Sequence, residues 1–294
     1  MGQSVDTVVL LTTWNRPSLL RRALRQIEGE VKRIGARLVI SDDGSSDAET
    51  RDLLARAHDH GADVLTRPEL GDVDVRLEEV VHAPPRDAMR TVATSPEGCE
   101  LIAFHARSGG NTAELRRGLA ALWRARLWDA HVSTQKNNLR GFRHVLASYP
   151  EAQWIVKVDD DVILHDGAFE VMRATWQRAE REGHDVLAVS GIRTVNEMLR
   201  GRFDGYGVTT GVCNVAVLYR RVDWQRLFVA STDEEVIDKG FDLVFAWDYA
   251  PRYRPGAVAI CVLPSLVYHA GRNGVNTRNA DVNCDFVGEL NSSA

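Results

Sequence analysis

The fold is decided near the N-terminus by the stretch VVLLTTWNRP at positions 8–17. Its first four residues, Val8 to Leu11, form an unbroken β-branched and aliphatic run, which is typical of a strand buried on both faces of a parallel sheet. Ser18 is the expected N-cap of a helix whose apolar residues recur at helical spacing. A second buried run, at 37–41, ends at a pair of aspartates. Strand, helix and strand at this spacing predict a βαβ unit, with ligands at the carboxyl ends of its strands.

Similar patterns continue along most of the chain. We expect further helices at 49–58, 138–148 and 168–182, and further strands at 154–158, 186–190, 215–219 and 257–262. The sequence therefore predicts an α/β fold with a mostly parallel central sheet flanked by helices.

The segment from about 48 to 131 departs from this regularity after its first helix. Residues 101–104 favour a short strand, and residues 67–98 show no clear periodicity. Five apolar residues form one helical stripe: Leu115, Leu119, Leu122, Trp123 and Leu127. We expect this segment to hold an insertion or subdomain of a single domain that spans 1–294.

Composition and charge are those of an ordinary globular protein. Of its 294 residues, 44% are hydrophobic and 26% are charged. A net charge of −5 argues against nucleic-acid binding, which normally uses a basic surface. No apolar run approaches the ~20 residues that span a bilayer, and the N-terminus lacks the basic and apolar parts of a signal peptide. We therefore expect a soluble protein without a transmembrane segment.

The cysteines are widely spaced and contain no CxxC pair: Cys99, Cys213, Cys261 and Cys284. This spacing argues against a zinc site or a redox dithiol. Reduced thiols in a cytoplasmic protein are the expected state.

The strongest chemical signal is Asp159-Asp160-Asp161, which directly follows the apolar run at 154–158. Three adjacent carboxylates repel one another, and burying them without compensation costs several kcal/mol each. Their oxygens suit Mg²⁺ or Mn²⁺, which usually take further ligands from water and substrate phosphates. The alternative is a solvated acidic turn after an edge strand.

Polar residues also follow the first two predicted strands. Thr12, Thr13, Asn15 and Arg16 come after the first strand, and Asp42-Asp43-Gly44-Ser45 comes after the second. Because the carboxyl ends of parallel strands meet at one edge, we expect these residues and the aspartate triplet to face one crevice. Both segments could equally be plain turns. At this edge they are candidates for binding a nucleotide.

Four segments in order, VVLLTTWNRP, LVISDDGSSD, WIVKVDDDVIL and PSLVYHAG, resemble the signature of family 2 and related GT-A glycosyltransferases. The resemblance covers both ends of the chain and is poor from about 48 to 131. It implies a GT-A nucleotide-binding core and inverting transfer of a sugar from a nucleoside-diphosphate sugar, most often a UDP-sugar, to an acceptor hydroxyl. It also implies an acceptor-side half from about 205 to 294.

The same resemblance implies roles for individual residues. Thr12 and Asp42 would contact the nucleobase or ribose, with Asp43 as a close alternative. Asp159 and Asp161 would form the DxD pair that binds Mn²⁺ or Mg²⁺, with Asp161 the first choice for the direct ligand, and Asp159 and Asp160 would also lie at the donor.

Two further positions match the family's pattern. Lys136-Asn137 precedes a predicted helix where relatives often show Arg-Asn, although lysine cannot grip a diphosphate bidentately. His269 follows a strand-like run and stands where the family often has a metal-binding histidine, the alternative being a structural histidine.

The resemblance also implies a catalytic base on a helix before that histidine, where relatives carry an acidic motif. Asp242 is the first choice because Gly240 can open a helix at the crevice, and Asp248 is the second. Either could simply cap or solvate a helix; Asp238, Glu234 and Glu235 come next. Residues 205–211 favour a flexible loop before a strand, or a plain glycine-rich connection. The resemblance implies that such a loop closes over donor or acceptor.

Two other functions compete with glycosyl transfer. A nucleotidyltransferase acting on a sugar phosphate would usually carry a Gly-rich basic loop after its first strand, and TTWNRP is not such a loop. A GT-A-like binding module without catalysis would have no need for the aspartate triplet together with His269. The sugar, the acceptor and the oligomeric state are not encoded in recognisable motifs.

Overall fold

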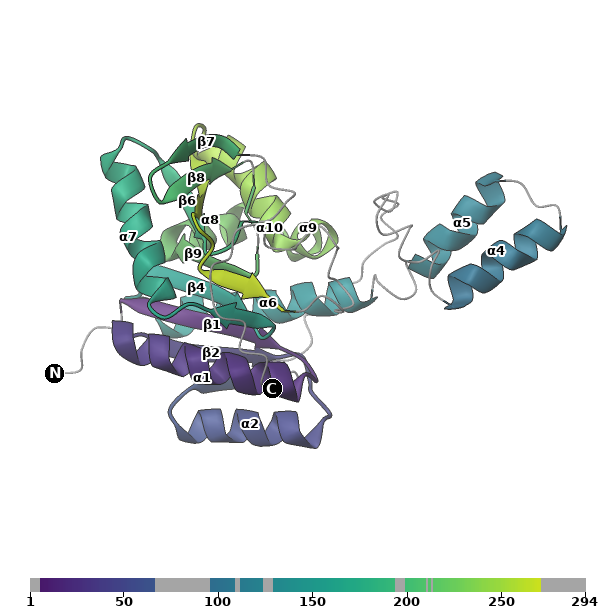
Figure 1. Ribbon diagram of the computed structural model, residues 1–294, viewed down its shortest axis with the longest axis horizontal. Helices are drawn as coiled ribbons and strands as arrows, with labels where there is room; N and C mark the ends of the chain where they lie inside the picture. The colour runs from purple at the N-terminus through teal and green to yellow at the C-terminus, as the bar shows by residue number, and fades with distance from the viewer. Residues whose placement is uncertain are drawn as a thin grey trace.

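The computed structural model describes residues 6–66, 96–108, 112–123, 129–193, 199–209, 211–212 and 214–270. Within these residues the chain forms three layers, with helices on both faces of a nine-stranded sheet (Figure 1). The strands lie in the order β3 (Asp63–Thr66), β2 (Arg37–Asp42), β1 (Thr7–Thr13), β4 (Trp154–Asp159), β9 (Ala216–Arg220), β6 (Val186–Ser190), β10 (Val258–Val262), β8 (Tyr206–Thr209) and β7 (Leu199–Phe203). A second, two-stranded sheet pairs β5 (Val162–Leu164) with β11 (Val267–His269).

Seven of the nine strands run in one direction. β9 is antiparallel to both of its neighbours, and β8 is antiparallel to both of its own, while all remaining pairs are parallel. Subtracting these two reversed strands from nine leaves the seven. The predicted α/β class, with a mostly parallel central sheet flanked by helices, is therefore confirmed.

Each face of the sheet has its own helical cover. One face carries α1 (Pro17–Ile34), α2 (Ala48–Asp59) and α7 (Ala168–Arg181). The other carries α6 (Asp129–Ser148), α8 (Arg221–Ala230), α9 (Asp233–Lys239), α10 (Phe241–Leu243), the π-helix η2 (Val244–Tyr249) and α11 (Ala250–Tyr253). Strand β1 is buried throughout because its alternate residues enter opposite cores: Val9 and Leu11 face the first layer, Val8 and Leu10 the second.

Aromatic packing fixes the second layer close to the sheet. Phe142 of α6 stacks on Trp224 of α8 with ring centroids 3.8 Å apart. The ring of Phe241, the first residue of α10, lies 5.5 Å from Phe142 and 5.4 Å from Trp224. Burial of each such ring contributes roughly 1.5–3 kcal/mol, so the start of α10 is firmly held against α6.

The helices α4 (Pro96–Ser108) and α5 (Thr112–Trp123) form a hairpin that stands apart from the rest of the fold (Figure 1). The strand predicted at 101–104 is therefore wrong, because this apolar run is part of α4 and packs on a neighbouring helix, with Leu101 against Gly118 of α5. Short apolar runs do not distinguish a strand from a helix by periodicity alone. The predicted helical stripe is confirmed at Leu115 and Leu119, whereas Leu127 lies outside the described residues.

Three further local predictions are corrected. Helix α1 begins at Pro17 with Arg16 as N-cap, not Ser18, since proline is pre-organised for the first helical position. Residues 206–209 form the buried strand β8 instead of a flexible loop, with Gly205 (φ 80°) making the turn from β7. Lys136 and Asn137 lie inside α6, which begins at 129 instead of 138. The first turns of α6 were not predicted, because some of their buried residues, such as Gln135, are polar and do not form the apolar stripe that indicates a helix.

No helix in the described part of the chain is both long and apolar enough to cross a bilayer.

Candidate active site

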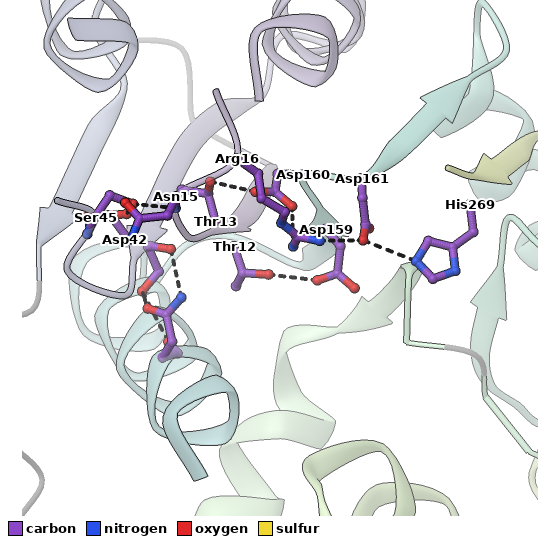
Figure 2. Close-up of polar contacts among 12 residues, drawn as sticks. Thr12, Thr13, Asn15, Arg16, Asp42, Ser45, Asp159, Asp160, Asp161 and His269 are labelled. Atoms are coloured by element: carbon purple, nitrogen blue, oxygen red, sulfur yellow. Dashed lines mark hydrogen bonds and ion pairs between the residues drawn. The ribbon is translucent and has the colours of Figure 1, made fainter. Parts of the chain in front are cut away.

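The carboxyl ends of β1, β2 and β4 lie next to one another. Thr12 is in register with Ser41 of β2 and Asp159 of β4, and Thr13 is in register with Asp42. The loops that follow these strands therefore meet at one edge, as the sequence predicts, and Figure 2 shows their polar side chains converging.

Asp159 is held by two neighbours. Thr12 Oγ1 donates a hydrogen bond of 2.8 Å to Asp159 Oδ1, and the Lys157 ammonium bonds the same oxygen. Lys157 is 1% exposed and also donates to the Asn214 carbonyl at 3.0 Å, so its charge is fixed in place. Sequence reasoning missed this lysine, although a charged residue within the apolar strand WIVKV was a usable signal.

Asp160 is fully buried. Thr13 Oγ1 donates to its Oδ2 at 2.7 Å, and the guanidinium of Arg16 lies 2.5 Å from its Oδ1. Burial is the largest influence on this carboxyl and raises its pKa to about 7, although Arg16 acts in the opposite direction. The middle aspartate thus lies inside the protein, behind its two neighbours.

Asp161 faces both a cation and a histidine. Arg16 Nη1 lies 2.6 Å from Asp161 Oδ2, and His269 Nε2 lies 3.3 Å from the same oxygen. Burial alone would raise the pKa of Asp161, but the hydrogen bond from His269 and the charge of Arg16 outweigh it and lower the pKa to about 2. Its other oxygen, Oδ1, is buried and has no hydrogen-bond partner among the residues that the structure describes.

The small sheet explains how His269 reaches this place. His269 of β11 is in register with Val162 of β5, and the backbone N–H of Ala270 donates to the Asp161 carbonyl at 2.7 Å. Residues 108 positions apart in the chain are therefore fixed beside each other. The sequence placed both residues in one site only through family resemblance, because β5 and β11 are short and their pairing leaves no periodic pattern.

Asp161 and His269 supply some of the ligands that a hard divalent cation needs. Among the described residues, no three His, Cys, Asp or Glu side chains already form a metal cage. Asp161 nevertheless offers a buried oxygen that no described residue bonds, and His269 offers a ring nitrogen on the same carboxylate. Mg²⁺ and Mn²⁺ often use one or two protein ligands and take the rest from water and phosphate. The residues present are consistent with such a site, in which Asp161 and His269 would be the protein ligands.

The neighbouring loops, 14–16 and 42–47, are joined by hydrogen bonds among themselves. Asp42 accepts from the backbone N–H of Ser45 at 2.8 Å and from its Oγ at 2.5 Å. Asn15 has a positive φ of 45°, and its side-chain carbonyl accepts from the backbone N–H groups of Ser46 and Asp47 at 2.8 and 2.9 Å. These contacts tie the two loops together, and a direct role of Asp42 and Asn15 at a donor remains a prediction.

Helix α6 is fastened to the same edge. Asn137 Nδ2 donates to the Ser41 carbonyl at 2.9 Å, and Ser41 Oγ donates to Asn137 Oδ1 at 2.7 Å. Asp43 accepts from Ser133 Oγ and lies 3.6 Å from Nη1 of the buried Arg140. Lys136, between these contacts, is half-buried on α6. Sequence reasoning missed Ser133 and Arg140, because only the folded helix brings them to β2.

The two candidate bases differ in their surroundings. Asp242 follows Phe241, whose backbone N–H donates to Gln135 Oε1 at 3.2 Å and whose ring centroid is 5.6 Å from Lys157 Nζ. This places the start of α10 near Lys157, the lysine that bonds Asp159, and Asp242 is half-buried. Asp248, in contrast, is exposed on η2 and forms an ion pair of 2.7 Å with Lys239.

The reserve candidates are also placed. Glu235 completes a capping box with Thr232 at the start of α9, and Glu234 is exposed on the same turn. The side chain of Asp238 lies outside the described residues.

Comparison with known proteins gives little sequence likeness. No protein-family model and no curated protein matches the chain. Among solved structures, S. aureus TarS is 12% identical with a TM-score of 0.42, covering 87% of this chain and 35% of its own. A mannose-1-phosphate geranyltransferase from Thermus thermophilus is 11% identical with a TM-score of 0.39, covering 88% of this chain and 74% of its own. This chain thus spans about a third of TarS, and both likenesses are too loose to transfer an activity.

Proposed function

We propose that the protein is a metal-dependent, inverting glycosyltransferase with a GT-A core that moves a sugar from a nucleoside-diphosphate sugar, favouring a UDP-sugar, to an acceptor hydroxyl. One observation carries the proposal. Asp161 stands at the carboxyl edge of the sheet with His269 beside one oxygen, and within the described ranges its other oxygen has no hydrogen-bond partner. A buried carboxylate oxygen without a partner is costly unless a ligand satisfies it.

The metal would be held by Asp161 and His269. When bound, Mn²⁺ or Mg²⁺ would stabilise negative charge on the leaving nucleoside diphosphate. Asp159 is already bonded to Thr12 and Lys157, so its part in the DxD pair would be to hold the edge of the site. Asp160 is sealed inside and would support its neighbours rather than touch the cation.

The base would be Asp242. The position of α10 supports this choice, because its first residue lies near Lys157, which bonds Asp159, and a general base must reach the proton of the attacking hydroxyl. The carboxylate would take that proton while the hydroxyl oxygen attacks the anomeric carbon from the face opposite the leaving group, so the configuration inverts. Asp248 is the weaker candidate because its carboxylate is exposed and paired with Lys239.

The released nucleotide product tests the proposal. The purified protein is incubated with Mn²⁺ and a set of nucleoside-diphosphate sugars, and separately with sugar 1-phosphates and nucleoside triphosphates. Release of a nucleoside diphosphate in the first reaction supports a glycosyltransferase. Release of pyrophosphate in the second would indicate a nucleotidyltransferase, and binding without any release would indicate a binding module.

A further inference from the structure

Arg16 occupies the position between two of the aspartates. Its Nη2 lies 2.5 Å from Asp160 Oδ1 and its Nη1 lies 2.6 Å from Asp161 Oδ2, and Figure 2 shows the guanidinium extending across both carboxylates. His269 approaches the same Oδ2 of Asp161 at 3.3 Å. The guanidinium therefore covers the carboxylate that the proposed function assigns to a metal ion.

Two cations cannot share this carboxylate without a penalty. Like charges this close together repel each other, and the repulsion is several-fold stronger at the effective dielectric of a protein surface than in water. A divalent ion on Asp161 and His269 would repel the guanidinium twice as strongly. Metal binding and the Arg16–Asp161 ion pair therefore oppose each other.

The surroundings allow Arg16 to move and prevent Lys157 from doing so. The Arg16 side chain is 35% exposed, whereas Lys157 is 1% exposed and is held by Asp159 and the Asn214 carbonyl. The backbone at Arg16 is fixed on both sides, by the Asn15 contacts to Ser46 and Asp47 and by Pro17 at the first turn of α1. Only the long side chain is left to change position.

We propose that Arg16 is an exchangeable counter-cation, a role that rests on the proposed function. In the nucleotide-free protein its guanidinium neutralises Asp160 and Asp161. When a divalent cation and the donor bind, the guanidinium leaves Asp161 and pairs with the donor's diphosphate. A planar guanidinium suits this exchange because it can bond either a carboxylate or a phosphate through two parallel N–H groups.

The experiment compares Arg16→Gln with wild type in two binding measurements. Mn²⁺ binding to the nucleotide-free protein is followed by electron paramagnetic resonance, and binding of uridine diphosphate in saturating Mn²⁺ is followed by calorimetry. The variant should bind Mn²⁺ about tenfold more tightly and uridine diphosphate about tenfold more weakly, each factor corresponding to one charge-assisted hydrogen bond. Opposite signs distinguish exchange from structural damage, which would weaken both.

Two further variants serve as controls. Arg21→Gln removes an arginine of α1 that pairs with the exposed Glu49, and it should leave both affinities unchanged. Arg16→Lys keeps the charge but loses the planar fork, and it should fall between wild type and Arg16→Gln.

The other outcomes overturn the proposal in distinguishable ways. Metal-coupled nucleotide binding that is unaffected by Arg16→Gln, or both affinities falling together, would make Arg16 a structural ion pair and leave the proposed function intact. Absence of Mn²⁺ binding in every protein, with and without nucleotide, would refute the metal-dependent function and the exchange with it.

Discussion

The candidate site has two halves that meet at the same edge of the sheet and are stabilised differently. The aspartate half contains Asp159 to Asp161 with Arg16 and His269, and ion pairs dominate it. The loop half contains Asn15, Asp42, Ser45, Ser46 and Asp47, and short-range hydrogen bonds satisfy its polar groups. Among the residues of these two halves, the buried oxygen with neither a hydrogen bond nor an ion pair belongs to Asp161. On the proposed function, the aspartate half would receive the ligand and the loop half would hold the shape of the site.

The largest expected effect tests the chemistry beside the aspartate half. Asp242→Asn keeps the shape of the side chain but removes the proton acceptor, so turnover should fall by about 10²–10⁴-fold with uridine diphosphate affinity nearly unchanged. Asp248→Asn is the matched control, because Asp248 is exposed on η2 and forms an ion pair with the exposed Lys239. Steady-state kinetics on both variants decides between them. A dead Asp248→Asn protein with an active Asp242→Asn protein would move the base to Asp248.

The next effect concerns the carboxylate of Asp161. Asp161→Asn leaves the fold in place but removes the negative charge, so uridine diphosphate should bind with the same affinity with or without Mn²⁺. Asp166→Asn, at an exposed acidic residue a few positions along the chain, is the control and should retain metal-coupled binding. Calorimetry of both variants checks this. Full metal coupling in Asp161→Asn would assign the cation to another residue.

His269→Ala should have a smaller effect on the same half. Losing one of two protein ligands should weaken Mn²⁺ binding by about 10–100-fold, judged from the effect of altering residues around metal sites. The melting temperature without metal should change little, because the Asp161–His269 contact lies at the edge of the two-stranded sheet. A marked fall in melting temperature with unchanged Mn²⁺ affinity would make His269 a structural residue.

The smallest effect on ligand binding is expected in the loop half. Asn15→Ala removes the acceptor of two backbone N–H groups, so the protein should lose about 1–3 kcal/mol of unfolding free energy. Denaturant titrations of both proteins measure this loss of stability. The Mn²⁺ affinity of the folded protein, measured by calorimetry, should stay within about twofold of wild type. Loss of metal binding without loss of stability would erase the distinction between the two halves.

Elements of the fold were predicted correctly from the sequence where the buried residues are the apolar ones. The run Val8 to Leu11 predicts β1 because each residue enters one of the two apolar cores. Prediction failed at the start of α6, where Asn137 is buried by hydrogen bonding to Ser41 and so breaks the apolar stripe of a helix. It also failed at β8, since the glycines that suggested a loop serve a turn and a tightly packed strand, Gly207 lying against Leu199.

In the site, too, some features follow from the sequence pattern and others depend on tertiary contacts. Strand ends predict that Asp42 and the aspartate triplet share one edge, because parallel strands align their carboxyl ends. The partners of those carboxylates were not predictable, since Arg16 and Asp161 are 145 positions apart and meet only through the register of β1 and β4. A residue's chemistry can be inferred from its type, but its ion pairs depend on the tertiary fold.

The most direct test of a metal-dependent nucleotide site is the coupling between Mn²⁺ and uridine diphosphate in the wild-type protein. The affinity for uridine diphosphate is measured by calorimetry in Mn²⁺ and again in excess chelator. The aspartate half predicts strong binding in Mn²⁺ and a loss of at least about tenfold on chelation, because an anionic diphosphate cannot approach Asp159 to Asp161 without an added cation. Equal affinity in Mn²⁺ and in chelator would contradict it.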